Sequence, residues 1–146
     1  MSLISLIYLS FATQTWSDTD LKMLLQSCRT NNTAKKITGM LLYRDKFFMQ
    51  VLEGDAADVE PLFEQIKRDQ RHMGVLVVHK KAISARSFVD WSMGFNKIGD
   101  AAAAQLPGFT DFLAQPNDGA YFAQKPDLAH KLLLSFKAKD GFYELV

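Results

Sequence analysis

Cysteine is nearly absent from this chain, and neither sign of charge dominates it. A single cysteine among 146 residues excludes a disulfide framework and any multi-cysteine metal cluster within one chain, and it fits a reducing compartment. The 17 basic and 16 acidic side chains balance, which argues against a broad nucleic-acid-binding face. Because 48% of the residues are hydrophobic, the composition is that of one globular domain with a buried core rather than of a disordered chain.

The first apolar run is too short to cross a membrane. It extends from Leu3 to Leu9 without a charge, whereas a membrane span needs roughly 20 apolar residues. No Lys or Arg precedes it, as the positive region of a secretory signal would require. We therefore interpret this run as a buried strand and expect a cytoplasmic protein without membrane contact.

Familiar catalytic and metal-binding motifs are missing. The sequence contains no Gly-rich phosphate loop of either common form, no His-Glu-x-x-His and no Gly-x-Ser-x-Gly. His72, His79 and His130 lack the spacing of metal ligands, and Cys28 lies on the inner face of a predicted helix, as a buried, unreactive thiol would. From these absences we expect a protein that has no metal site and is not an enzyme.

Apolar spacing predicts two amphipathic helices. The first begins after the N-cap and acidic side chains of residues 17–20, repeats apolar residues at i, i+3, i+4 and i+7, and ends near Asn31 and Asn32. The second shows the same spacing from Val59 to Ile66 and ends near Asp69.

Apolar runs around these helices predict five strands. The runs are Leu3–Leu9, Ile37–Tyr43, Phe47–Leu52, Val75–His79, which Gly74 opens, and Phe88–Phe95. The order β-α-β-β-α-β-β predicts an α+β fold of the ferredoxin-like kind, a sandwich of one mixed sheet with two helices on one face.

The remaining residues predict a C-terminal helical extension. Leu128, Ala129, Leu132, Leu133 and Phe136 share one helical face. We expect residues 1–98 to form the domain and residues 99–146 to form a cap without a core of its own. The apolar face of the cap has two candidate positions, the open face of the sheet and a partner subunit.

Two polar residues interrupt the apolar strands. Tyr8 lies within the first strand and Gln50 within the third, and a buried amide without a partner costs roughly 1–3 kcal/mol. One interpretation is a Tyr–Gln hydrogen bond at an edge of the sheet. The other is that both side chains face a polar ligand in a mainly apolar cleft. Asn31 and Asn32 have a structural interpretation too, because Asn tolerates the left-handed conformation that ends helices.

Five motifs occur in an order that is known from one family. They are Leu6–Ser10, Asn31-Asn32 with Ile37–Leu41, Phe48–Gly54, Asp69–His72 and Phe88–Met93. Together, over residues 3–96, they resemble the BLUF domain, the flavin-binding blue-light sensor. This resemblance favours the ligand interpretation of Tyr8 and Gln50.

The resemblance implies a role for each matching position. Tyr8 and Gln50 would be the photoactive pair, with Gln50 between the Tyr8 hydroxyl and the N5/O4 edge of the flavin. Trp91 and Met93, two apart on one strand, would lie near Gln50 on the same face. The other implied flavin contacts are Asn31 and Asn32 at the C4=O/N3 side, Leu24, Phe48 and Ile66 around the ring, Cys28 facing it, and Lys35, Asp69, Arg71 and His72 toward the ribityl and phosphate end.

The resemblance also implies a mechanism and partners. Blue light would drive an electron and a proton from Tyr8 to the flavin by way of Gln50. Their return would leave rearranged hydrogen bonds around Gln50 and a small red shift of the absorption. The implied cofactor is FAD, with FMN as the alternative, and the implied output is light-dependent binding to a separate protein, or self-association as a homo-oligomer.

Two other functions stay open at this point. The first is a constitutive flavin or small-ligand binding module without a photocycle. The second is a small hydrolase of the acylphosphatase type, which would use Arg29 with Asn31 or Asn32 to bind phosphate.

Overall fold

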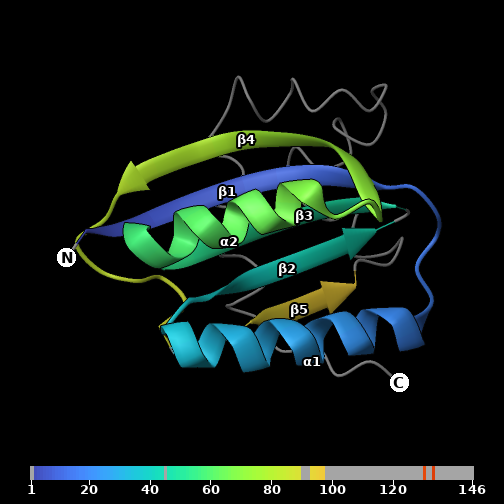
Figure 1. The fold of residues 1–146 in the computed structure, drawn as a ribbon, viewed down its shortest axis with the longest axis horizontal. Helices are drawn as coiled ribbons and strands as arrows, with labels where there is room; N and C mark the ends of the chain where they lie inside the picture. Colours follow the sequence, from blue (N-terminus) through green and yellow to red (C-terminus); the bar gives the residue numbers. More distant parts are fainter. Residues whose placement is uncertain (1, 45, 90–92, 98–129, 131–132, 134–146) are drawn as a thin grey trace.

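The fold is a five-stranded sheet with two helices. The computed structural model describes residues 2–44, 46–89, 93–97, 130 and 133. In chain order the elements are β1 (Leu3–Ala12), α1 (Asp18–Lys35), β2 (Thr38–Arg44), β3 (Phe47–Asp55), α2 (Ala56–Arg68), β4 (His72–Ala82) and β5 (Gly94–Lys97). Figure 1 shows this arrangement.

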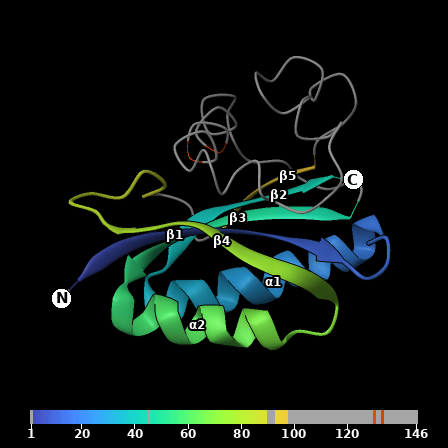
Figure 2. The same ribbon diagram turned by 90° about the horizontal axis from the view of Figure 1, so that it is seen from above.

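The strand order confirms the predicted ferredoxin-like α+β fold. The sheet runs β4-β1-β3-β2-β5, with β5 parallel to β2 and every other neighbouring pair antiparallel. Both helices lie on the same face of the sheet (Figure 2). β1 and β3 are buried along nearly their whole length because each has a strand on either side and is covered on both faces. No helix in the described part of the chain is long and apolar enough to cross a membrane.

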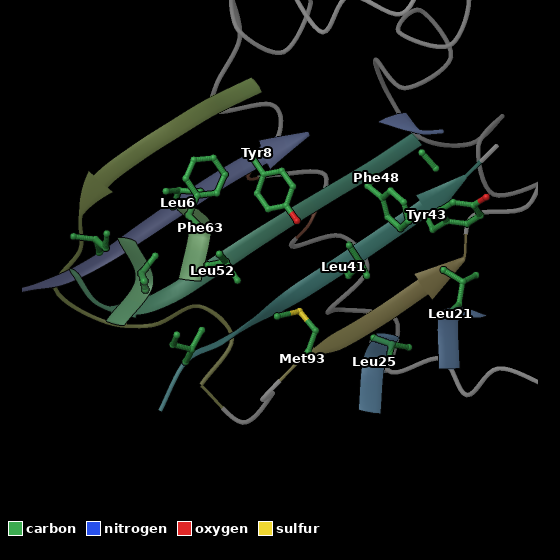
Figure 3. Packing of buried hydrophobic residues seen from close by; sticks show 14 residues of the cluster. Leu6, Tyr8, Leu21, Leu25, Leu41, Tyr43, Phe48, Leu52, Phe63 and Met93 are labelled. Carbon is green, nitrogen blue, oxygen red and sulfur yellow. The ribbon is translucent and has the colours of Figure 1, made fainter. Parts of the chain in front are cut away.

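The helix-facing side of the sheet forms one apolar cluster with the two helices. Leu6 and Tyr8 of β1 belong to it together with Phe63 of α2, and the Tyr8 and Phe63 rings lie 5.4 Å apart between centroids. Figure 3 shows Tyr8 beside Phe63, with Phe48 farther along the same face. Since successive side chains of a strand alternate between faces, this packing aims every second residue of β1 at the helices.

Helix α1 continues past the asparagines at which the sequence predicts its end. Its start agrees with the prediction, since Ser17 accepts from the Asp20 N–H and Asp20 accepts from the Ser17 N–H in a capping box. Its last residue is Lys35, and Lys36 adopts the left-handed conformation, with φ of 55°. Asn31 and Asn32 are therefore helical, and their interpretation as left-handed terminators is wrong.

Strand β4 extends beyond the predicted run at both ends and contains a bulge. Leu9 pairs with Leu76 and Phe11 with Met73, so one residue of β1 lies opposite two of β4. Gly74, which was expected to open the strand, lies inside this bulge with φ of +64°. Glycine adopts this conformation without the steric cost that other residues incur.

The predicted strand over Phe88–Phe95 is wrong for most of its described length. Phe88 and Val89 lie in a bend and turn, Met93 lies in a bend, and strand pairing begins at Gly94. The backbone N–H of Phe88 donates to the Glu53 carboxylate. This N–H is therefore not used in a hydrogen bond to a neighbouring strand. Trp91 lies outside the described residues, so the expectation that it shares a strand face with Met93 stays a prediction.

Only two residues of the predicted C-terminal extension are described. His130 and Leu133 are both helical; Leu133 is buried and His130 is half-buried. The His130 ring stacks on that of His79 in β4, with centroids 6.1 Å apart and planes at 8°. This contact supports the open face of the sheet as the position of this part of the extension.

Candidate functional site

The polar centre of the site is a pair of cross-strand neighbours. Tyr8 of β1 and Gln50 of β3 are directly opposite in the antiparallel register, so their side chains emerge on the same face. The Tyr8 hydroxyl donates to Gln50 Oε1. Both residues are only 4% exposed. Because β1 and β3 are interior strands, the expected Tyr–Gln hydrogen bond exists but lies in the middle of the sheet and not at an edge.

Met93 is the second partner of Gln50. The Gln50 amide Nε2 donates to Met93 Sδ at 3.3 Å, and Met93 is buried. The carbonyl of Met93 accepts from Arg29 Nε of α1 at 3.1 Å, which holds Met93 against the helix face of the sheet. This places Met93 beside Gln50, as the resemblance implies, although from a bend before β5 rather than from within a strand.

Glu53 fixes the segment that leads to Met93. Its carboxylate is buried and accepts from the backbone N–H groups of Ser87, at 2.9 Å, and Phe88, at 2.8 Å. Arg86 Nη1 donates to the Glu53 carbonyl at 2.8 Å and to Thr38 Oγ1 at 3.0 Å. These bonds connect residues 86–88 to β2 and β3, two of the strands that carry the site.

Burial controls the protonation of the two acidic groups at the centre. It raises the pKa of the Tyr8 hydroxyl well above its usual range, and negative charge on Cys28 and Asp69 adds to the shift. Burial also raises the pKa of the Cys28 thiol, against the opposing effect of Arg71 and Arg29. Both groups therefore stay protonated near neutral pH, and Tyr8 is a hydrogen-bond donor.

A cavity of about 110 Å³ opens between the two helices and the sheet, above Tyr8 and Gln50. Every flavin contact that the resemblance implies lines this cavity except Lys35, which is exposed and lies outside the lining. The predicted residues that it brings together are Tyr8, Leu24, Cys28, Asn31, Asn32, Phe48, Gln50, Ile66, Asp69, Arg71 and His72. A contact of Lys35 with flavin stays a prediction.

Four further residues line the cavity that the sequence analysis does not assign to it: Trp16, Ser27, Leu41 and Leu62. Two of these four residues could have been assigned to the site from their positions relative to residues already predicted there. Leu62 lies one turn before Ile66 on the apolar face of α2, and Leu41 pairs with Gln50 in the β2–β3 register. Trp16 lies in the loop before α1, where no periodicity shows the direction of a side chain.

Charged and polar groups that follow α2 line part of the cavity. Arg71 Nη2 and Asp69 Oδ2 are 2.6 Å apart, and this pairing holds the pKa of the Asp69 carboxyl below its usual range. His72 Nε2 lies 2.5 Å from the Ile66 carbonyl and Nδ1 lies 2.8 Å from Ser10 Oγ. Because a carbonyl only accepts, Nε2 carries the proton, and these two bonds fix the orientation of the ring.

Arg29, on which the hydrolase alternative depends, does not line the cavity that Asn31 and Asn32 line. Arg29 is directed to the Met93 carbonyl by its Nε, and Asn32 is buried in the wall of the cavity. No group of three or more metal-ligating side chains occurs in the described ranges.

Comparison with known proteins assigns the chain to a family. The family profile described as "BLUF: Sensors of blue-light using FAD" matches residues 3–94. The photoactivated adenylate cyclase subunit beta of Euglena longa is 32% identical over 115 residues, which are 78% of this chain and 13% of that protein. The subunit alpha of Euglena gracilis is 32% identical over 113 residues, 77% of this chain and 11% of that protein. The chain thus spans about an eighth of the length of these curated relatives.

Solved structures agree with this assignment. The chain is similar to BlsA in its photo-activated state, with 30% identity and a TM-score of 0.68 over 86% of this chain and 94% of that chain. It is also similar to the dark-state structure of BlrB, a BLUF protein, with 30% identity and a TM-score of 0.68 over 90% of this chain and 98% of that one. With its family profile, its sequence relatives and its fold in agreement, this chain belongs to the BLUF family of flavin-binding blue-light sensors.

Proposed function

We propose that this BLUF protein senses blue light through Tyr8 and Gln50, with FAD in the cavity above them. The observation that carries the proposal is the buried series Tyr8–Gln50–Met93, of which Tyr8 and Gln50 line that cavity. It joins an oxidisable phenol to an amide that has two distinct hydrogen-bonding atoms. Such an amide can exchange its bonds without any change in the covalent structure of the chain.

The residues of the cavity fit a flavin. Leu24, Phe48 and Ile66 supply apolar walls for a flat ring, while Gln50 and Asn32 supply amide donors and acceptors for its carbonyl and nitrogen edge. Arg71 supplies positive charge for phosphate at the other end. Among the described residues that line the cavity, Arg71 is the permanently charged cation.

When bound and excited by blue light, a flavin is an oxidant strong enough to take an electron from a nearby phenol. Tyr8 is the buried phenol of the cavity, and its proton already points to Gln50 Oε1, so the proton can leave along an existing hydrogen bond. On the other side of Gln50, a thioether is a weak acceptor, so the amide loses little when it turns away from Met93. Rotation or tautomerisation of Gln50 is therefore the rearrangement that these contacts favour.

The size of the rearrangement limits the output. A neutral hydrogen bond contributes about 0.5–1.5 kcal/mol net, whereas inverting a two-state equilibrium from 1:99 to 99:1 needs about 5.5 kcal/mol. Exchange of two or three bonds therefore biases an equilibrium and gives a graded signal. The segment from Met93 into β5 carries this signal toward residues 99–146, which act as a cap on the domain formed by residues 1–98.

This chain acts as the light sensor, and its signal passes to an effector protein. Relatives are named photoactivated adenylate cyclases, and the chain matches only a small part of their length. The output is light-dependent binding to a partner or a change in a homo-oligomer. The single cysteine fits a cytoplasmic protein.

Absorption spectra in the dark and under blue light test the proposal. Wild-type protein purified with bound flavin should show a reversible red shift, and Tyr8→Phe or Gln50→Ala should abolish it while flavin remains bound. Tyr43→Phe is the matched control. Tyr43 is a second buried tyrosine on the same face, where its hydroxyl accepts from the Trp16 N–H instead of donating to Gln50. Bound flavin without a light-induced shift in the wild type would instead support a constitutive binding module.

A further inference from the structure

A second cavity, of about 320 Å³, lies on the face of the sheet that points away from α1 and α2. Figure 2 shows this face opposite to the one that both helices cover. Residues of β1, β3 and β4, the segment that follows β4, and His130 line the cavity. No described residue lines both this cavity and the one above Tyr8 and Gln50. We call it the far-face cavity.

Three of its lining residues form a row across three neighbouring strands. Lys81 of β4 pairs with Ser5 of β1, and Ser5 pairs with Glu53 of β3, so the three side chains emerge on one face. His79 lies two residues before Lys81 in β4 and therefore shares this face. The row places an ammonium group, a hydroxyl group and a carboxylate side by side.

The carboxylate of this row already has partners within the protein. Both oxygens of Glu53 accept backbone N–H groups, those of Ser87 and Phe88. Arg86 donates to the Glu53 carbonyl at 2.8 Å, which brings a guanidinium group beside the same residue. These donors offset the negative charge of Glu53, so it does not determine the charge of an occupant.

Ser5 and Lys81 have no such partners among the described residues. Ser5 is 2% exposed, and no described group forms a hydrogen bond with its Oγ. Lys81 forms no ion pair with a described carboxylate, whereas the adjacent Lys80 pairs with Glu60 at 2.9 Å on the helix-facing side. Since a buried hydroxyl without a partner is costly, an occupant that bonds to Ser5 would gain affinity from it.

An oxyanion is the group that satisfies both side chains. The Lys81 ammonium only donates hydrogen bonds, and the Ser5 hydroxyl can donate as well, so both fit a negatively charged acceptor. The imidazoles of His79 and His130 line the same space and supply further N–H donors. A phosphate group offers three strong acceptor oxygens to these donors. The volume lies in the range of about 300–1,000 Å³ of organic ligand pockets, so it has room for more than the phosphate alone.

We propose that the far-face cavity binds a small phosphate monoester, with its phosphate at Ser5 and Lys81. This site goes beyond the proposed function, because it adds a second ligand on the opposite face of the sheet from the flavin. Ser87 lines the cavity and also donates its backbone N–H to Glu53. The occupant would therefore contact the segment that leads to Met93.

Proton NMR of the flavin-loaded protein tests the proposal, with glycerol 3-phosphate as the probe at constant pH. The chain has three histidines, and two of them line the far-face cavity. Their ring signals should shift and saturate as the probe is added, while that of His72, which lines the flavin cavity, should stay in place. His79→Ala and His130→Ala assign the signals. Glycerol is the uncharged control and should move none of the three.

Ser5→Ala removes the hydroxyl and separates a ligand contact from a structural role. Loss of one hydrogen bond to a charged group should weaken binding of the probe by about 10- to 150-fold. The stability of the protein without the probe should stay the same or rise, because no described group loses a bond. A purely structural serine would instead lower the stability when replaced.

Two adjacent lysines give a matched pair of charge variants. Lys81→Gln should weaken binding about two- to fivefold, a modest effect because Lys81 is exposed. Lys80→Gln removes the same charge one residue away, where the side chain points to the helices, and should leave the affinity close to that of the wild type.

Each outcome decides for or against the site. Saturating shifts that weaken in Ser5→Ala and Lys81→Gln but not in Lys80→Gln would support it. A wild-type protein whose His79 and His130 signals do not respond to the probe, or respond equally to glycerol, would overturn it. Equal affinities of Ser5→Ala and the wild type would overturn it as well. None of these measurements depends on the photocycle, so failure of this site would leave the proposed function in place.

Discussion

At the scale of single residues, burial keeps the proton on the Tyr8 hydroxyl. A phenol in this position is surrounded by apolar side chains, and ionisation would leave a charge that they cannot solvate. Its partner Gln50 is equally buried and keeps both amide ends bonded, to Tyr8 and to Met93. Each polar atom of the Tyr8–Gln50 pair therefore has a defined partner in this structure.

The raised pKa of Tyr8 predicts a loss of stability at alkaline pH. The unfolded chain releases the tyrosine proton near its ordinary pKa of about 10, while the folded chain retains it, so the unfolded state is favoured increasingly above that pH. The stabilisation is complete below pH 10, and each further unit removes up to about 1.4 kcal/mol. Urea unfolding of the wild type and Tyr8→Phe from pH 8 to 11 should give a smaller alkaline slope for the variant.

The slope, and not the absolute stability, is the quantity to compare. Tyr8→Phe also leaves Gln50 Oε1 without its donor, which lowers stability by an amount that does not vary with pH. Parallel curves for the two proteins would show that Tyr8 does not titrate differently in the folded and unfolded states.

At the scale of secondary structure elements, the β2–β3 pair depends on a glycine at a close approach. A Cβ atom at Gly39 would lie 1.9 Å from the carbonyl oxygen of Val51. That oxygen belongs to the backbone of β3, which also carries Gln50, so it cannot move without disturbing the site. Glycine at position 39 therefore permits the two strands to pair at this distance.

Gly39→Ala should destabilise the protein by about 3 kcal/mol, in the range that overpacking a well-packed site costs, and should weaken flavin binding with it. Gly54→Ala is the control in the neighbouring strand. There the nearest atoms are side-chain carbons of Ile37 and Val59 at 3.3 Å, which can shift by a few tenths of an ångström. Chemical denaturation should rank Gly39→Ala well below Gly54→Ala, and equal stabilities would contradict the steric argument.

At the scale of the whole molecule, both faces of the central strands β1 and β3 are buried. The face with Tyr8 packs on α1 and α2. Ile7, the next residue of β1, points to the opposite face, where it pairs with His79 and is fully buried. His130 reaches this second face from the C-terminal region and stacks on His79. The far end of the chain is thereby connected to the strand that borders β1.

A double-mutant cycle measures this connection. His79→Ala, His130→Ala and the double variant should give a coupling free energy of about 0.5–1.5 kcal/mol, the usual range for a stacked aromatic pair. Thermal or urea unfolding supplies the four stabilities. If the losses of stability in the two single variants add up to that of the double variant, the two rings do not stabilise each other, and other contacts hold the residues near His130.

Local patterns of the sequence determined the order of the elements and most of the site. Apolar periodicity depends on residues that are close in the chain, so it predicted α1 and α2 and the faces that carry Leu24, Cys28 and Ile66. Tyr8 and Gln50 stood out because each interrupts an apolar strand. That they bond to each other follows from the β1–β3 register, which agrees with their joint assignment as a pair.

Contacts between distant parts of the chain determined the features that local sequence patterns did not predict. Glu53 takes the backbone N–H groups of Ser87 and Phe88, so a β-rich run forms a bend, and the position of Met93 follows from it. Trp16, in the loop before α1, lies against Arg71, which follows α2 far along the chain. No local sequence pattern encodes such contacts. They depend on how the folded elements pack and on which backbone and side-chain groups still lack a hydrogen-bond partner once the sheet has formed.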